Sequence, residues 1–133
     1  MNPVTRSLLE NIDDPDLAEF AMAWDALEEQ IVRIYRAGAC LPAEAIAFKR
    51  GLPTAFGLYR RWAEALAPHW RAVSVEGAPV ERDPFDCILH IGGAKEVIGN
   101  WSLMRTLPAA REALNHLLLE WGRGMKRPRR APG

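Results

Sequence analysis

Apolar residues recur at steps of three and four positions through most of this chain, which is the spacing of one face of an α-helix. The clearest stripe runs for about five turns and consists of Leu17, Phe20, Trp24, Leu27, Ile31 and Ile34. Asp14 followed by Pro15 is a typical helix start, and Gly38 is a typical helix end. These signals predict one long helix between Pro15 and Gly38.

Two helices joined by a short corner are predicted after this one. The first covers residues 42–50, and the second runs from residue 53 or 54 to residue 67, with Pro68 closing it. Gly51 and Leu52 lie between them and form the corner. The apolar face of the second helix consists of Ala55, Tyr59, Trp62 and Leu66.

Two shorter features have weaker signals. Residues 5–12 form a helical segment in which Ser7 and Glu10 have the spacing of a capping box. Between residues 71 and 82, valines alternate with polar residues before Gly77, which is typical of either a small β-hairpin or an irregular loop.

Helical spacing returns in the second half of the chain. Asp83 and Pro84 repeat the helix-start pair, and the apolar run at residues 85–91 is a helix or a buried strand, of which we favour the helix. The pattern continues helically over residues 97–107, and Pro108 then opens a last helix. The stripe of this last helix consists of Ala110, Leu114, Leu117 and Trp121.

These elements predict an all-α fold, or one that is nearly so. We expect a single compact domain of several helices over residues 1–121, with at most a small hairpin near residues 71–82. Residues 122–133 are basic and contain almost nothing to bury, so we expect a disordered tail. No internal repeat is present in the sequence.

Length and composition narrow the class of protein. A chain of 133 residues is long enough for a hydrophobic core without disulfides. Its two cysteines, Cys40 and Cys87, are too few for a disulfide framework or a zinc site, and we interpret them as small buried thiols. No segment has the pattern of a signal peptide or of a membrane-spanning helix. We therefore expect a cytoplasmic protein that does not bind a membrane.

The charged residues are unevenly distributed, although 17 basic and 17 acidic side chains give a net charge of zero. Residues 10–29 contain eight acids and no base, whereas residues 49–71 contain five bases and one acid. The tail adds further bases and no acid. A polyanionic partner is therefore compatible with the neutral total.

The helix-corner-helix segment resembles the helix-turn-helix of bacterial DNA-binding regulators and transposase-like proteins. Ala47 precedes the turn Gly51 by four positions, Leu52 and Pro53 follow the glycine, and an aromatic and basic group ends the second helix: Tyr59, Arg60, Arg61 and Trp62. The resemblance covers residues 44–66. It implies a second helix that enters the DNA major groove.

This resemblance and the charges lead to a first hypothesis, a small non-enzymatic regulator or accessory factor that binds duplex DNA and works in a dimer or larger assembly. Thr54, Arg60 and Arg61 would read the groove, while Lys49, Arg50 and Arg71 would contact phosphates. The tail would add affinity without sequence preference through Lys126, Arg127, Arg129 and Arg130.

A second hypothesis is a non-catalytic helical adaptor, subunit or inhibitor that acts on other proteins. The acidic first long helix, including Glu28 and Glu29, would then dock onto a partner, or the acids would simply form a solvated face. Most of the five tryptophans are expected in the core. Trp70 is the one to which we assign a role at a partner interface.

Candidate catalytic and ligand-binding groups are few. Asp86 and Cys87 lie four and three positions before His90, so a helix would place both near the imidazole. The sequence at residues 92–95, Gly-Gly-Ala-Lys, resembles a phosphate-binding helix start but lacks the spacing of a P-loop. His69 and His116 are isolated, so we predict no metal site, no cofactor and no enzymatic activity.

Overall fold

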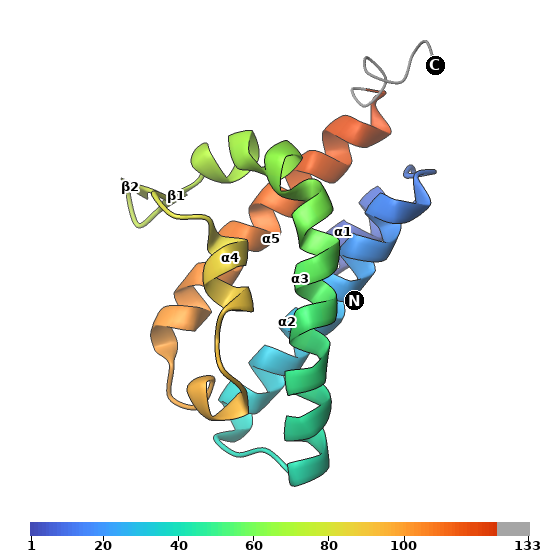
Figure 1. Cartoon of the computed structure of the whole chain (residues 1–133). Coiled ribbons are helices and arrows are strands. Elements are labelled where there is room, and N and C mark those ends of the chain that lie inside the picture. The colour runs from blue at the N-terminus through green and yellow to red at the C-terminus, as the bar shows by residue number, and fades with distance from the viewer. Residues whose placement is uncertain (125–133) are drawn as a thin grey trace.

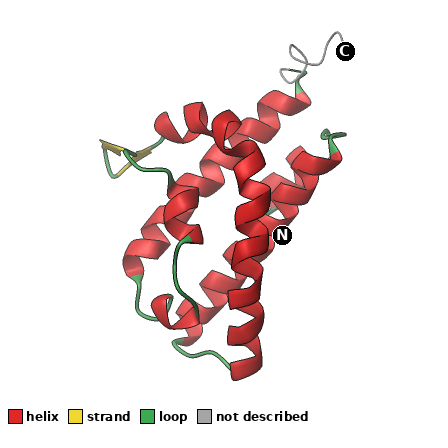
Figure 2. Cartoon of the chain, viewed as in Figure 1, coloured by secondary structure: helices red, strands yellow, loops and turns green. Residues whose placement is uncertain are grey.

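Proline is the first residue of four α-helices in the described part of the chain, residues 1–124 of a computed structural model. Proline suits this position because its fixed φ is already helical and the N–H that it lacks would have no partner there. The α-helices, shown in Figure 1 and Figure 2, are α1 (Pro3–Leu9), α2 (Pro15–Ala37), α3 (Pro42–Arg71), α4 (Pro84–Leu89) and α5 (Trp101–Gly122). The prediction of a nearly all-α fold is confirmed.

Side-chain caps fix where most of these helices begin. Asp14 and Asp83 each accept hydrogen bonds from backbone N–H groups of the first turn, which confirms the two predicted Asp-Pro starts. Gly38 ends α2 in the left-handed conformation, with φ of 67°, also as predicted. The capping box expected in residues 5–12 is wrong. Asn2 is the cap instead, so α1 begins at Pro3 and ends at Leu9.

The predicted corner at Gly51 and Leu52 is absent. α3 is one continuous helix of 30 residues that passes through Gly51 and Pro53. The reason is that its buried stripe keeps the same phase across this point: Phe48, Leu52, Ala55, Tyr59, Trp62, Leu66 and Trp70. Pro53 removes one intrahelical hydrogen bond, but it lies on the exposed side, where water can bind the free carbonyl.

Pro68 bends α3 rather than ending it. The helix continues to Arg71, and its last turns swing sharply away from the straight part in Figure 1. Proline in a helix interior clashes with the carbonyl four residues earlier, which is a common cause of such bends. The prediction that α3 closes before Pro68 is therefore wrong.

Replacing Gly51 by alanine is expected to raise the free energy of unfolding by about 0.5–1 kcal/mol, because alanine loses less backbone entropy in a helix interior. A Cβ atom added at Gly51 meets no atom within 4 Å, so nothing opposes this gain. Urea denaturation measures the change. The matched control is Gly38→Ala, which places alanine at a φ of 67° and should destabilise the protein. A destabilised Gly51→Ala variant would indicate a corner at this position.

A small hairpin and two short helices connect α3 to α5. Strands β1 (Ser74–Val75) and β2 (Ala78–Pro79) pair antiparallel, so the hairpin interpretation of residues 71–82 is confirmed. Its two turn residues, Glu76 and Gly77, have φ of 53° and 84°, the sign that a tight hairpin turn requires. The 3₁₀-helix η1 (Ala94–Glu96) follows α4.

The last helix is longer than predicted. α5 begins at Trp101, where Asn100 accepts a hydrogen bond from the N–H of Leu103, and Pro108 lies inside the helix rather than at its start. The expectation of a separate helix over residues 97–107 is therefore wrong.

The core lies where α2, α3 and α5 meet, with α4 packed between α3 and α5 and α1 packed on α5. Phe85 of α4 lies between Phe20, Trp24 and Tyr59, with ring centroids 4.7–6.1 Å away. The Tyr59 hydroxyl also donates a hydrogen bond to Asp83, the cap of α4. Four of the five tryptophans are buried, as expected, whereas Trp101 is 59% exposed.

Candidate nucleic-acid interface

The basic residues of α3 lie on its exposed side, opposite the buried stripe. Lys49, Arg50, Arg60 and Arg61 are all exposed, as is Arg71 beyond the bend. Lys49 and Arg60 are 11 residues apart, as are Arg50 and Arg61, and 11 residues are just over three full helical turns. Each pair therefore shares a row along the straight part of α3, with its members about 16 Å apart.

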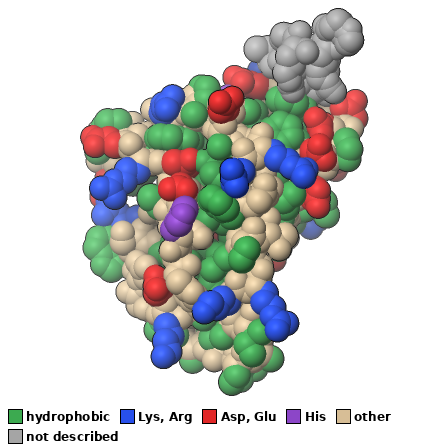
Figure 3. All heavy atoms as spheres, in the orientation of Figure 1, with side chains coloured by type: hydrophobic (Ala, Val, Ile, Leu, Met, Phe, Trp, Pro, Cys, Tyr) green, Lys and Arg blue, Asp and Glu red, His purple; other side chains and the backbone are tan. Residues whose placement is uncertain are grey.

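Few acids oppose these charges. Glu64 is the only acid between Lys49 and Arg71. Among the described residues, Arg61 alone of these five bases forms an ion pair, to Asp16 at 3.9 Å, and both side chains are 62% exposed. Figure 3 looks onto this side of the molecule and shows Lys and Arg side chains spread along it, with acids along its margins. An exposed pair at this distance holds its partners weakly, so all five bases remain accessible.

The packing of α3 limits how it can meet a duplex. It packs against three helices, α2, α4 and α5. A major groove is about 12 Å wide, close to the diameter of one helix with its side chains, so these neighbours limit how deeply α3 can enter it. The five bases can reach phosphates, and the exposed Thr54 can donate a hydrogen bond to one. The predicted tail residues Lys126, Arg127, Arg129 and Arg130 lie outside the described residues, as does the predicted disorder of residues 125–133. Gly122, the first residue of the predicted tail, belongs to α5.

The three residues predicted to bind a protein partner are not on one free surface. Trp70 is only 7% exposed and closes the buried stripe of α3, so its assignment to an interface is wrong. Glu28 contacts Arg111 of α5, and Glu29 lies 2.9 Å from the ammonium group of Met1. Of the three, Glu29 alone has a side chain more than half exposed.

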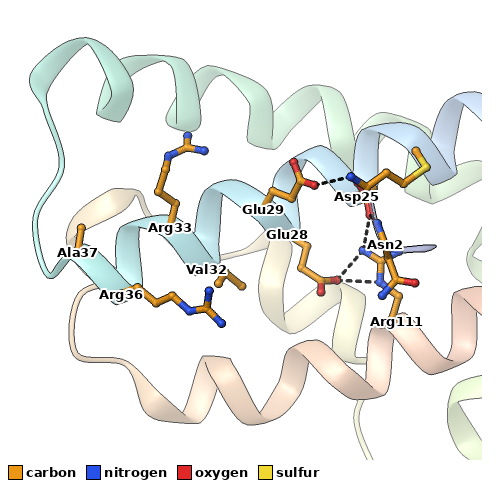
Figure 4. A pocket seen from close by; sticks show the side chains of 10 residues that line it. Asn2, Asp25, Glu28, Glu29, Val32, Arg33, Arg36, Ala37 and Arg111 are labelled. Atoms are coloured by element: carbon orange, nitrogen blue, oxygen red, sulfur yellow. Dashed lines mark hydrogen bonds and ion pairs between the residues drawn. The ribbon is translucent and has the colours of Figure 1, made fainter. Parts of the chain in front are cut away.

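A buried cluster around Arg111 joins α1, α2 and α5, as Figure 4 shows in part. The guanidinium group donates to three side chains: from Nε to Glu28 at 3.1 Å, from Nη1 to Thr5 at 2.8 Å and from Nη2 to Asp25 at 3.0 Å. Thr5 in turn donates to Asn115 at 2.8 Å. Arg111 is 8% exposed and Asp25 is 4% exposed. The sequence contained no signal for this cluster beyond an arginine in the middle of the last helix.

Burial of Glu28 raises the pKa of its carboxyl group above the ordinary value, although Arg111 lowers it through charge and hydrogen bonding. Asp25 and Glu29 add a smaller upward effect because they carry like charge. The loss of hydration is therefore the dominant effect at this carboxylate. The three acids of the cluster share two cations, Arg111 and the Met1 ammonium group.

Asp86, Cys87 and His90 do not form a nucleophilic group. The His90 ring nitrogen Nδ1 lies 3.3 Å from the Asp86 carboxylate and 2.8 Å from the Asp86 carbonyl oxygen. Cys87 is exposed rather than buried as predicted, and partial desolvation raises the pKa of its thiol. A raised pKa disfavours the thiolate, which is the reactive form.

The other candidate ligand-binding residues, Gly92, His69 and His116, each lie close to another side chain of the protein. The Glu96 carboxylate lies directly over Gly92, where a phosphate would otherwise approach the backbone. His69 lies 3.1 Å from Glu120 and its ring is 6.2 Å from that of His116. Within residues 1–124, no three metal-binding side chains converge. No helix in that range combines the length and the apolar character needed to cross a membrane.

Comparisons with known proteins give no relative from which a role could be transferred. No protein-family model, no curated protein and no solved structure matches this chain.

Proposed function

We propose that this chain is a small non-enzymatic nucleic-acid-binding accessory protein that holds the phosphate backbone of a duplex along the exposed side of α3. The observation that carries this proposal is the placement of Lys49, Arg50, Arg60 and Arg61 in two rows on one continuous helix. Arg71 extends the basic surface past the bend at Pro68.

The surroundings of these bases favour backbone contacts over base readout. α3 packs against α2, α4 and α5, and its bases lie along its side rather than in its first turn. Its exposed side also lacks a free aromatic platform for stacking single-stranded bases, since Phe56 is half-buried and has the Arg60 guanidinium 5.9 Å from its ring centre. Binding should therefore depend on salt and very little on sequence.

Replacing Arg60 and Arg61 together by glutamine is expected to weaken duplex binding and its salt dependence. Each lost phosphate contact removes about 0.9 from the slope of log K against log salt, so the double variant should lose about 2 from the slope. Fluorescence anisotropy with a labelled 20-base-pair duplex of mixed sequence, from 50 to 200 mM salt, measures both quantities.

The matched control removes two exposed arginines elsewhere, Arg6 of α1 and Arg36 of α2. Arg6→Gln/Arg36→Gln carries the same net charge change and should keep the slope of the parent protein. Equal losses in the two double variants would indicate a net-charge effect, and an unchanged Arg60→Gln/Arg61→Gln variant would exclude α3 as the binding surface.

A protein-binding adaptor is the second candidate function. It is favoured by two exposed apolar side chains near the turn from α2 to α3, Leu41 at 72% and Ile46 at 54% exposure. If the folded protein binds no duplex at low salt, sedimentation of the parent and of a Leu41→Ser/Ile46→Ser variant tests this role. Self-association that the two substitutions abolish would support it.

A further inference from the structure

A cavity of about 730 Å³ lies against α2, next to the Arg111 cluster. This volume is within the range of small-molecule sites in proteins. Seven of its lining residues come from α2, and the others come from α5 and the first two residues of the chain. The cavity plays no part in the proposed binding of nucleic acid.

The lining separates opposite charges along the helix axis. Asp25, Glu28 and Glu29 lie at one end, Arg33 and Arg36 lie at the other, and Val32 lies between them. Arg111 and the Met1 ammonium group lie among the three acids and offset part of their charge. In Figure 4 the Arg36 side chain extends back along α2 toward Val32, whereas Arg33 points away toward α3. Arg33 is bound to Glu44 at 2.7 Å, so Arg36 is the base that faces the open space.

The acidic end retains capacity for a cation. Arg111 uses Nε, Nη1 and Nη2 on its protein partners, so at most one of its five N–H groups is left for another acceptor. Both of its contacts to Glu28 go to the Oε1 atom, and Oε2 has no partner among residues 1–124. The Met1 ammonium group lies 2.9 Å from Glu29 and 3.9 Å from Asp25, so Glu28 is the acid with an oxygen left open for a further cation.

The basic end has a free cation. Arg36 makes no hydrogen bond or ion pair with any other residue in the range 1–124, and its planar group can bind a carboxylate through two parallel hydrogen bonds. The apolar side chains of Val32 and Ala37 line the cavity near it. An occupant therefore needs a positive end, a short neutral middle and a carboxylate.

We propose that this cavity binds a short dipolar molecule of the size of an extended di- or tripeptide with free ends. Its ammonium group would lie at Oε2 of Glu28, and its carboxylate would lie at Arg36. Glu28 and Arg36 are eight residues apart, which is about 12 Å along the helix, and Arg36 leans back to shorten this span. An extended peptide covers about 3.4 Å per residue, so three residues reach about 10 Å.

A series of alanine peptides tests the length and both charged ends. Chemical-shift changes in ¹⁵N-labelled full-length protein give the dissociation constants for alanine, dialanine, trialanine and hexaalanine. Dialanine or trialanine should bind most tightly, because free alanine cannot span both ends and hexaalanine is too long to place both. Acetylating the amino end or amidating the carboxyl end should each weaken binding about tenfold, since each removes a charged hydrogen bond.

The Arg36→Gln variant distinguishes peptide binding in this cavity from nonspecific electrostatic attraction to the protein surface. The variant should bind trialanine and trialanine amide equally, because it lacks the group that distinguishes them. Arg6→Gln, which removes an exposed arginine elsewhere, should keep the preference. The proposal is overturned if no unblocked peptide shifts the resonances of α2, if blocked and free peptides bind equally, or if Arg36→Gln retains the preference. Duplex binding by α3 is measured separately and can fail or succeed independently.

Discussion

Replacing Arg111 by methionine is expected to lower the free energy of unfolding by about 3–5 kcal/mol, the usual cost of removing one partner from a buried ion pair. The substitution leaves Asp25, which is 4% exposed, and Glu28 without their shared cation. It also removes the donor to the fully buried Thr5 hydroxyl. Methionine fills a similar volume, so the loss of charge rather than of packing should dominate. Urea denaturation at pH 7 measures the change.

Two further variants separate the charge from its geometry. Arg111→Lys keeps the charge but lacks the planar fork that reaches three partners, so it should recover only part of the stability. Arg111→Met combined with Asp25→Asn and Glu28→Gln removes all three charges and should be more stable than Arg111→Met alone. Exposed ion pairs contribute less than about 1 kcal/mol. If Arg111→Met lowers the free energy of unfolding by no more than this, water hydrates the acids in place of the arginine.

Replacing Phe85 by alanine is expected to lower the free energy of unfolding by about 3–5 kcal/mol, as for other buried aromatic residues. Phe85 is fully buried and its ring stacks on that of Tyr59 at 5.3 Å, with an interplanar angle of 16°. It also meets Trp24 edge-on at 4.7 Å. The substitution removes the main anchor of α4, a helix of six residues. Thermal unfolding followed by near-ultraviolet circular dichroism measures both the stability and the tryptophan environment.

Phe56→Ala is the matched control for this experiment. Phe56 is half-buried on α3 and touches His90 at a ring distance of 5.5 Å. It buries less apolar surface, so its loss should cost clearly less and should leave the near-ultraviolet spectrum in place. Equal effects of the two substitutions would contradict the packing described for α4.

The bounds of a helix could be predicted from the sequence where an apolar stripe and the capping residues at its ends indicated the same helix. Asp14, Pro15 and Gly38 bounded α2 correctly because each acts through local backbone geometry. The predicted corner at Gly51 is wrong because glycine and proline act only as local breakers, whereas the in-phase Phe48 and Leu52 pack α3 against its neighbouring helices as one continuous helix. Packing of a continuous apolar face outweighs the local preferences of two residues.

Some of the candidate surface residues could be predicted from the sequence and others could not, because the sequence shows helical periodicity but not the packing of helices on one another. Arg60 and Arg61 were placed outward correctly, since the helical period alone decides which side of α3 they occupy. The assignment of Trp70 to a surface depended on an end at Pro68 that does not exist. The Arg111 cluster could not be foreseen, because Thr5, Asp25 and Arg111 are brought together only by the packing of three helices.

The cluster that closes the α1–α2–α5 interface has a consequence for the order of folding. Its hydrogen bonds link residues separated by 83–110 positions, whereas α2 and α3 are joined by a turn of four residues. Contacts of long sequence separation cost more loop entropy and tend to form late. The α2–α3 pair should therefore form early, and Arg111→Met should accelerate unfolding far more than it slows refolding. On the ribosome, α1 would have to wait for nearly the whole chain before it could dock on α5.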